Sequence, residues 1–221
     1  MRVDMHVHTR GSFDCLTEPD ALVERAIACG LDMVCITDHN EIDVALELHE
    51  RYPERVIVGE EVKTRERVDI IGLWLTERIP EGTPAGETCE RVHEQGGIVY
   101  VPHPFAGGKG GGGRLLATIE HMIDSCEGFN ARIHEPALNT RAVEWARRRD
   151  IAVGAGSDAH TLGELCAAYV DMPAFDGDPV SFLDALRRGT IHGTASPRQV
   201  HVASTWAKVR KRLPGAWKRT V

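Results

Sequence analysis

Long hydrophobic runs are absent from this sequence of 221 residues, and none approaches the roughly 20 residues that a helix needs to cross a membrane. The first residues also lack the basic-then-apolar pattern of a secretory signal. We therefore expect a cytoplasmic protein with no membrane span.

Closely spaced cysteine pairs are absent as well. No two of the six cysteines form a C-x-x-C motif, which argues against a zinc finger or a disulfide framework. Most of them stand in apolar stretches and are predicted to be small buried side chains. They are Cys15, Cys29, Cys35, Cys89, Cys126 and Cys166.

An excess of positive charge is missing too. The formal net charge is −7, which argues against a general nucleic-acid binder that holds a stable duplex by electrostatics alone. It does not exclude an enzyme that holds phosphates locally. The glycine-rich stretch 107–113 does not make a nucleoside-triphosphate P-loop, because Lys109 is followed by Gly110 and not by Ser or Thr.

What the chain contains is typical of one soluble α/β domain. Hydrophobic residues make up 42% and charged residues 27% of it, and its length suits one domain better than two. Apolar strand patterns alternate with helix patterns, with about seven strands, which predicts a parallel β/α architecture. The expected strands lie at about 2–8, 33–37, 56–59, 68–75, 98–101, 126–130 and 151–155.

The first strand carries two histidines on one face. Val3, Met5 and Val7 alternate with polar residues, and this period of two places His6 and His8 on the same side. Two imidazoles that point one way can bind one transition-metal ion. A pair on a solvated strand face is the alternative, so the rest of the chain decides.

Metal-binding residue types recur where the later strands end. Because the carboxyl ends of parallel strands meet at one edge of a sheet or mouth of a barrel, we expect these side chains to form one site. With the first pair, the set is His6, His8, His39, Glu61, His103, Asp158 and His160.

In order and spacing, this set resembles the PHP (polymerase and histidinol phosphatase) superfamily of metal-dependent phosphoesterases. The motifs that carry the resemblance are 6–9 (HVHT), 36–40 (ITDHN), 59–61 (GEE), 102–104 (PHP) and 156–160 (GSDAH). The resemblance covers residues 1–195 and implies a distorted (β/α)7 barrel with two to three divalent ions (Mn, Zn or Fe) at its mouth.

The resemblance also implies roles. His6, His8, Glu61 and Asp158 would hold a first ion, Glu61 and His103 a second, and Asp14, His39 and His160 a third. The catalytic set is then His6, His8, Glu61, Asp158 and His160. Such ions would activate water and stabilise charge on the phosphoryl oxygens during hydrolysis.

Two further positions are matched less closely. Glu127 and Asn130 follow the family's pattern after the sixth strand, and we expect Glu127 to complete the second metal shell and Asn130 to touch substrate. An ordinary structural acid is the alternative for Glu127. Lys109, Arg114 and Arg132 are candidate phosphate-binding residues, because cations near the mouth suit phosphate, or else solvated surface charges.

The last stretch, 196–221, differs from the barrel. Its end, from Thr205 on, is basic and contains no acid. The spacing of Trp206, Val209 and Leu213 predicts a helix docked on the barrel through that apolar stripe, with its cationic face in solvent. A contact with RNA or an anionic membrane is the alternative.

These observations favour a phosphoesterase that acts on a nucleotide or a short oligonucleotide. The glycines of 107–113 would place Lys109 and Arg114 on a mobile rim, which suits a substrate with a second phosphate or a trailing nucleotide. A small-metabolite phosphatase of the histidinol-phosphate type and a non-catalytic metal-binding module are the alternatives. Nothing in the sequence determines the oligomeric state.

Overall fold

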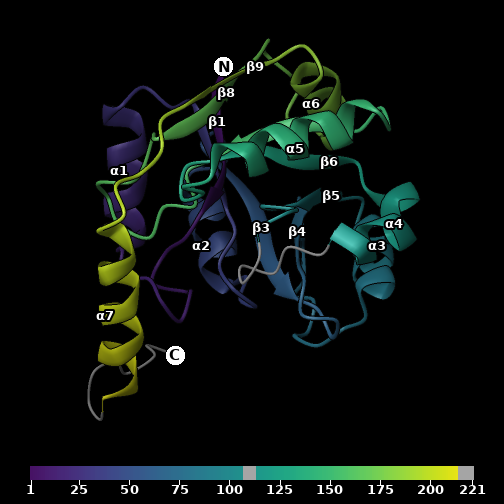
Figure 1. The fold of residues 1–221 in the computed structure, drawn as a ribbon. Helices are drawn as coiled ribbons and strands as arrows, with labels where there is room; N and C mark the ends of the chain where they lie inside the picture. The colour runs from purple at the N-terminus through teal and green to yellow at the C-terminus, as the bar shows by residue number, and fades with distance from the viewer. Residues whose placement is uncertain (107–112, 214–221) are drawn as a thin grey trace.

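Nine strands form one curved sheet in the computed structural model, which describes residues 1–106 and 113–213 (Figure 1). Their order is β7-β6-β5-β4-β3-β2-β1-β8-β9. The strands are β1 (Arg2–Val7), β2 (Met33–Ile36), β3 (Val56–Lys63), β4 (Asp69–Leu73), β5 (Ile98–Val101), β6 (Ser125–Asn130), β7 (Ala152–Gly156), β8 (Ala168–Asp171) and β9 (Thr190–Gly193).

Within the described residues, seven helices and one 3₁₀ turn connect and cover these strands. They are α1 (Pro19–Ala28), α2 (Asp43–Arg51), α3 (Ala85–Glu94), α4 (Gly113–Ile119), the 3₁₀ turn η1 (Glu120–Met122), α5 (Pro136–Arg147), α6 (Pro179–Leu186) and α7 (Val200–Arg212). Within the described ranges, no helix has the length and apolar character to cross a membrane.

Strands β1 to β7 curve until the two ends of the series meet. The amide of His8 donates to the carbonyl of Ala159 (3.0 Å), and the amide of Asp158 donates to the carbonyl of His6 (2.8 Å). These bonds join the end of β1 to the segment that follows β7. The predicted distorted (β/α)7 barrel is confirmed.

The strand pattern predicts a parallel sheet, but the observed sheet is mixed. β4 is antiparallel to both β3 and β5. Only the residues 64–68 separate β3 from β4, too few for the crossover that a parallel pair needs. β8 and β9, which the sequence did not predict, are antiparallel additions: β8 pairs with the start of β1 at Arg2 and Val3.

Apolar side chains pack on both faces of the central strands. On β2, Val34 and Ile36 belong to the cluster that contains Leu22 of α1 and Leu48 of α2. The alternate residue Cys35 belongs to a second cluster, which includes Tyr100 of β5. Strands buried on both faces appear in sequence as continuous apolar runs, which is why β2 could be predicted.

One disulfide contradicts the expectation for the cysteines. Cys29, at the end of α1, is joined to Cys166, which precedes β8, while the other four cysteines are free and buried. The prediction was wrong for this pair because 137 positions separate the two residues, and only the folded chain brings them together.

The contacts of α7 also differ from the prediction. Trp206, Val209 and Leu213 are 57%, 47% and 49% exposed, so the apolar stripe does not dock on the barrel. Ser204 and Ala207 are buried instead. Polar groups of the barrel hold the opposite side of the helix, as described below, and this overrides the apolar periodicity.

Candidate metal centre

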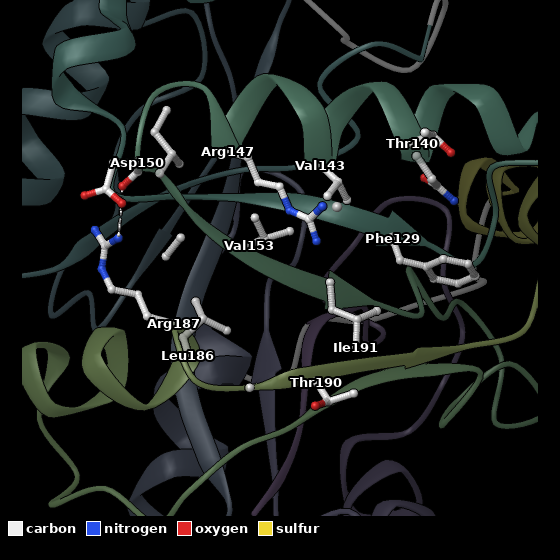
Figure 2. A pocket seen from close by; sticks show the side chains of 15 residues that line it. Phe129, Thr140, Val143, Arg147, Asp150, Val153, Leu186, Arg187, Thr190 and Ile191 are labelled. Atoms are coloured by element: carbon white, nitrogen blue, oxygen red, sulfur yellow. Dashed lines mark hydrogen bonds and ion pairs between the residues drawn. The ribbon is translucent and has the colours of Figure 1, made fainter.

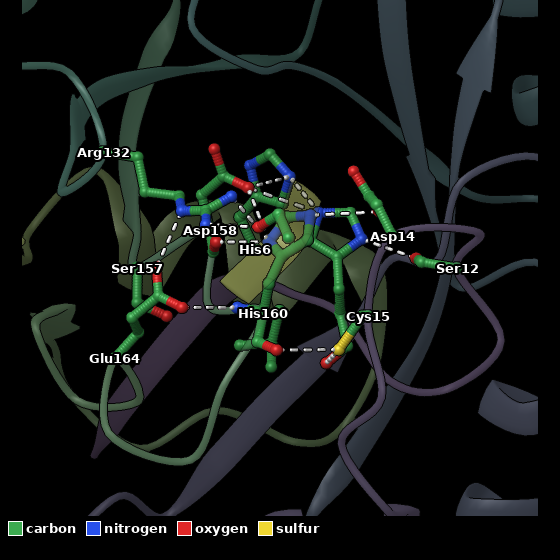
Figure 3. Close-up of polar contacts among 12 residues, drawn as sticks. His6, Ser12, Asp14, Cys15, Arg132, Ser157, Asp158, His160 and Glu164 are labelled. Atoms are coloured by element: carbon green, nitrogen blue, oxygen red, sulfur yellow. Dashed lines mark hydrogen bonds and ion pairs between the residues drawn. The ribbon is translucent and has the colours of Figure 1, made fainter. Parts of the chain in front are cut away.

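Side chains from five strand ends and one loop meet at the mouth of the barrel. β1 places His6 and His8, β2 is followed by His39, and β3 contains Glu61. β5 is followed by His103 and β7 by Asp158 and His160, and Asp14 comes from the loop between β1 and α1. Figure 3 shows His6, Asp14, Asp158 and His160 converging.

Three overlapping groups of these residues have the separations that a metal ion needs. Within each group the ligand atoms lie within 4.8 Å of one another. The groups are His8, His39 and His160; His6, His8 and Asp158; and His6, Glu61 and His103. Because His6 and His8 belong to two groups each, the three positions share ligands and form one connected centre.

The shortest distances lie around the first pair of histidines. His6 Nε2 is 3.0 Å from His8 Nε2, and these two nitrogens are 3.4 and 3.5 Å from Glu61 Oε2. His8 Nε2 is 3.4 Å from Asp158 Oδ1. Four ligand atoms of the kind that Zn, Mn and Fe accept thus surround one point.

The outer nitrogens of the rings are held by acceptors. His6 Nδ1 lies 3.0 Å from Glu127 Oε1, and His8 Nδ1 lies 2.9 Å from Ser12 Oγ. The Ser12 hydroxyl donates in turn to Asp38 (2.7 Å). These partners place a proton on each Nδ1 and leave both Nε2 lone pairs facing the centre.

These atoms fit a cation better than they fit one another. Two imidazole lone pairs 3.0 Å apart repel unless a proton or a metal ion lies between them. Glu61 Oε1 is buried without a hydrogen-bond partner among the described residues, although His103 Nε2 is only 3.2 Å away. Buried polar atoms of this kind are normally satisfied, so the donor set matches divalent ions.

Comparison with known proteins identifies the family. The model of the PHP domain matches residues 4–129. The chain belongs to the PHP family. A second model, described as PHP-associated, matches residues 136–191.

Two relatives of this PHP protein are uncharacterised proteins of Methanocaldococcus jannaschii. One is 32% identical over 198 residues, which are 85% of this chain and 79% of the relative. The other is 35% identical over 156 residues, which are 65% of this chain and 90% of the relative.

Solved structures share the fold at low sequence identity. A two-domain protein of Bacteroides vulgatus, with a domain predicted to be a PHP-like metal-dependent phosphoesterase, has a TM-score of 0.70 at 16% identity, covering 94% of this chain and 69% of its own. PsfC of Pseudomonas syringae has a TM-score of 0.69 at 19% identity, with 94% and 97% covered. The lesion-specific endonuclease EndoQ of Pyrococcus furiosus has 0.63 at 16%, with 85% and 56% covered.

The family match places the protein among metal-dependent phosphoesterases, which hydrolyse phosphate esters. Its His, Asp and Glu groups provide the means to bind the metal. Which residue binds which ion, and which substrate is cleaved, remain predictions.

Glu127 occupies a different place in the PHP centre from the one predicted. Its Oε1 faces His6 Nδ1, and its Oε2 accepts from the amide of His103 (2.7 Å) and from Asn130 Nδ2 (2.9 Å). With both oxygens engaged behind His6, Glu127 orients ligands and is not one of the converging groups. Its residue type alone could not show on which side of His6 it lies.

Asn130 is likewise turned into the protein. It is fully buried, and its Nδ2 contacts Asp158 Oδ2 (3.3 Å) as well as Glu127, while its Oδ1 accepts from the amide of Arg132. These bonds use the side chain to support the centre, so the expected contact with substrate is not supported.

Arg132 is not a free phosphate-binding residue. Its Nε donates to Glu164 (2.7 Å), its Nη1 lies 3.0 Å from His160 Nδ1, and its Nη2 donates to Ser204 of α7 (2.6 Å). The side chain is 4% exposed. The buried Glu164, distant in sequence, takes the guanidinium, so these contacts favour a structural role for Arg132 over phosphate binding. Lys109 lies outside the described residues, and Arg114 lies in the first turn of α4.

Two acids that the sequence analysis missed hold the ligand-bearing segments. Asp38 accepts from the amides of Thr9 (2.7 Å) and Ser12 (3.1 Å) and from both of their hydroxyls. Asp4 accepts from the amides of His6 and Ser157, and burial raises its pKa to about 7. The only local sequence feature that could have identified Asp38 is that it directly precedes His39. For Asp4 the only such feature is its place in the alternating pattern of β1.

The surroundings of His6 and His8 shift the pKa values of these two residues in opposite directions. Burial disfavours a charged His6, but Glu127, Asp158 and Glu61 outweigh it and hold the pKa of His6 well above its usual value. Burial, together with His160 and His39, holds the pKa of His8 well below. Protons and metal ions therefore compete for the same nitrogen atoms.

A cavity of about 800 Å³ lies away from the metal centre, between α5, β7 and β9 (Figure 2). Phe129, Val153 and Ile191 line it together with Arg147, and Arg187 forms an ion pair with Asp150 at its edge. None of the predicted ligands lines this cavity, so it is separate from the metal centre.

Proposed function

We propose that this PHP protein hydrolyses a phosphate ester of a nucleotide or a short oligonucleotide. The proposal is carried by one arrangement: a buried centre of three overlapping ligand groups, with an exposed aromatic ring at its edge. Phe13 is 51% exposed, and its ring centroid is 5.1 Å from that of His39. An exposed ring in this position could stack with a nucleobase whose phosphate lies in the centre.

The ligand assignment that we propose uses two to three ions of Mn, Zn or Fe. His6, His8, Glu61 and Asp158 would hold the first, Glu61 and His103 the second, and Asp14, His39 and His160 the third. Bound divalent ions would lower the pKa of a water molecule and stabilise negative charge on the phosphoryl oxygens.

The distances among Asp14, His39 and His160 support their assignment to the third ion. Asp14 Oδ1 lies 3.3 Å from His160 Nε2 and 3.7 Å from His39 Nε2. His39 Nδ1 lies 3.0 Å from Glu61 Oε2, which connects this group to the other two. A phosphoryl group in the centre could therefore meet positive charge on more than one side.

A nucleotide is favoured over a small metabolite by two features. One is Phe13, and the other is a feature of the sequence: the cations Lys109 and Arg114 follow His103 within a glycine-rich stretch, which suits a substrate with a second phosphate or a trailing nucleotide. The structural neighbour that acts on lesions as an endonuclease is consistent with a nucleic-acid phosphodiester as substrate. Histidinol phosphate remains the runner-up substrate type, and a cytoplasmic location stays a prediction.

The test is a comparison of kcat/KM for the manganese-loaded protein on four substrates: a nucleoside monophosphate, a nucleoside bearing two separate phosphates, a short oligonucleotide and histidinol phosphate. We expect the second and third to be hydrolysed most efficiently. Arg114→Ala should lower kcat/KM for these larger substrates and leave that for p-nitrophenyl phosphate nearly unchanged, because it would remove a remote contact.

A higher kcat/KM for histidinol phosphate would reject the nucleotide assignment in favour of a metabolite phosphatase. An equal effect of Arg114→Ala on p-nitrophenyl phosphate would reject the extended site. A loaded protein that hydrolyses none of these esters would contradict the nucleotide assignment and favour the non-catalytic binding module.

A further inference from the structure

Helix α7 lies outside both segments that match the family models, 4–129 and 136–191. In Figure 1 it runs along the side of the barrel, next to the loop that follows β1. That loop carries Asp14, one of the predicted metal ligands. The side of α7 that faces the barrel therefore lies at the edge of the metal centre.

Two polar contacts fix α7 against this edge. Near its start, the buried guanidinium of Arg132 donates to Ser204 Oγ (2.6 Å) and to the carbonyl of Val200 (3.3 Å). Near its end, Lys211 Nζ donates to the carbonyl oxygens of Arg10 and Ser12. The first contact joins α7 to the residue that touches His160, and the second to the loop of Asp14.

Lys208 is held between these two contacts and on the same face. It follows Ser204 by four positions and precedes Lys211 by three, which are the spacings of neighbours on a helix surface. Its Nζ lies 3.5 Å from Asp14 Oδ2 and 5.2 Å from the ring centroid of Phe13. The helix thus delivers one ammonium group to the point where Phe13 and Asp14 border the centre.

The side chain of Lys208 is 42% exposed. Asp14, by contrast, is 8% exposed and already has His160 and His39 beside its Oδ1. Lys208 therefore lies between the buried Asp14 and the solvent.

Divalent ions in the centre would repel an ammonium group this close to a ligand oxygen. An anion that contacts both the ions and Lys208 removes that repulsion, and a phosphate has oxygens enough for both. We propose that Lys208 binds a phosphoryl oxygen of the phosphate group held in the metal centre, so that α7 completes a phosphate site that the PHP barrel alone does not contain. This proposal rests on the proposed function.

The proposal differs from the role expected of Arg114. Arg114 should matter only for substrates that extend beyond the reacting phosphate, whereas Lys208 should matter for every phosphate, including inorganic phosphate. It also separates Lys208 from Lys211, whose contacts are with backbone carbonyls and hold the helix.

The experiment measures binding of inorganic phosphate to the manganese-loaded protein by calorimetry, and KM for p-nitrophenyl phosphate and for a nucleotide. Lys208→Ala should weaken phosphate binding and raise both KM values about tenfold, the loss of one charge-assisted contact. Lys208→Arg should retain most of the affinity. The control is Arg210→Ala, which removes the same charge from an exposed position two residues further on and should change none of these values.

Metal content and the melting temperature are measured for each variant. The proposal is overturned if Lys208→Ala binds phosphate as Arg210→Ala does, or if Lys208→Ala chiefly increases the number of bound ions. The second result would mean that Lys208 is only a counter-ion of Asp14. Phosphate binding is measured without turnover, so a protein that binds phosphate through Lys208 but hydrolyses no ester would contradict the proposed function and leave this inference standing.

Discussion

His6 and His8 differ in the group that contacts the Nδ1 atom of each ring. His6 is backed by a carboxylate, Glu127, whereas His8 is backed by the neutral hydroxyl of Ser12. The carboxylate favours a positive charge on His6, and the pKa values of the two rings are shifted in opposite directions. The basicity of His6 therefore depends on Glu127, and mutation of Glu127 should act through His6.

The first prediction compares ligands with this supporting acid. His8→Ala and Asp158→Ala should abolish hydrolysis, because each removes an atom that faces the centre. Glu127→Gln should lower metal affinity or activity by about 10- to 100-fold, the usual effect of a lost supporting contact. His93→Ala, on α3 and paired with Asp124, should leave kcat/KM nearly unchanged. Equal losses in all four variants would show that the site lies elsewhere.

The second prediction concerns pH. Burial lowers the pKa of His39, but Glu61 and Asp14 outweigh it and raise the pKa to about 9. The folded pKa exceeds the unfolded value near 6.5, so in chelator the contribution of His39 to stability is full below about pH 6.5 and is lost as pH rises through about 9. Metal binding must displace the same proton, so metal affinity should rise over this range.

Melting curves in chelator and in manganese, recorded between pH 6 and 9.5, check this prediction. The difference in melting temperature between the two conditions should grow with pH, and it should grow less in His39→Gln, which does not titrate. A difference that shrinks as the pH rises would contradict the assignment of His39 to the centre.

At the scale of the elements, the strands position the ligands through very close backbone contacts. β7 ends at Gly156, where a Cβ atom would overlap the side chain of His6 and lie 2.6 Å from Glu127 Oε1. No other residue type leaves room for the His6–Glu127 pair. The closure of the barrel and the orientation of His6 thus depend on the absence of a side chain at Gly156.

The third prediction follows from this contact. Gly156→Ala should reduce the free energy of unfolding by about 1–3 kcal/mol, the usual range for overpacking, and should weaken metal binding because His6 must move. Gly86→Ala is the matched control: it lies in α3 with no atom within 4 Å of the added Cβ, and it should be neutral or stabilising by about 0.5–1 kcal/mol. Urea unfolding of both variants decides, and equal values would refute the close-contact argument.

Local patterns predicted most of the elements, though not β8 and β9, and they did not show which elements pair with one another. Apolar runs such as 33–36 and the alternation of 2–8 predict strands, and a His or Asp directly after such a run predicts the mouth. The antiparallel β4, the ion pair of Arg132 with Glu164 and the position of Glu127 behind His6 depend on residues distant in sequence. Helix α7 illustrates the limit: its apolar stripe was the strongest local signal, and two distant polar contacts decide which side faces the barrel.

At the scale of the whole molecule, the charges are divided along the chain. Residues 185–221 contain no Asp or Glu, although the complete chain has a net charge of −7. The acids are therefore concentrated in the barrel, and part of the basic segment, as α7, borders the mouth. A phosphorylated substrate approaching an acidic protein would meet positive charge there, from the bound ions and from Lys208.

The last prediction concerns the metals and the stability of the whole fold. The predicted ligands come from β1, β3 and the segments that follow β1, β2, β5 and β7, so bound ions connect most of the barrel. Protein loaded with manganese or zinc should contain two to three ions per chain by elemental analysis. Because only the folded chain presents this site, loading should stabilise it by about 2.7 kcal/mol for each ion present at 100 times its dissociation constant, and chelation should lower the melting temperature accordingly. His8→Ala should lose both the ions and most of this stabilisation, whereas His93→Ala should keep them. Fewer than one ion per chain after loading, or a melting temperature that chelation does not change, would contradict a metal centre at the mouth of this barrel.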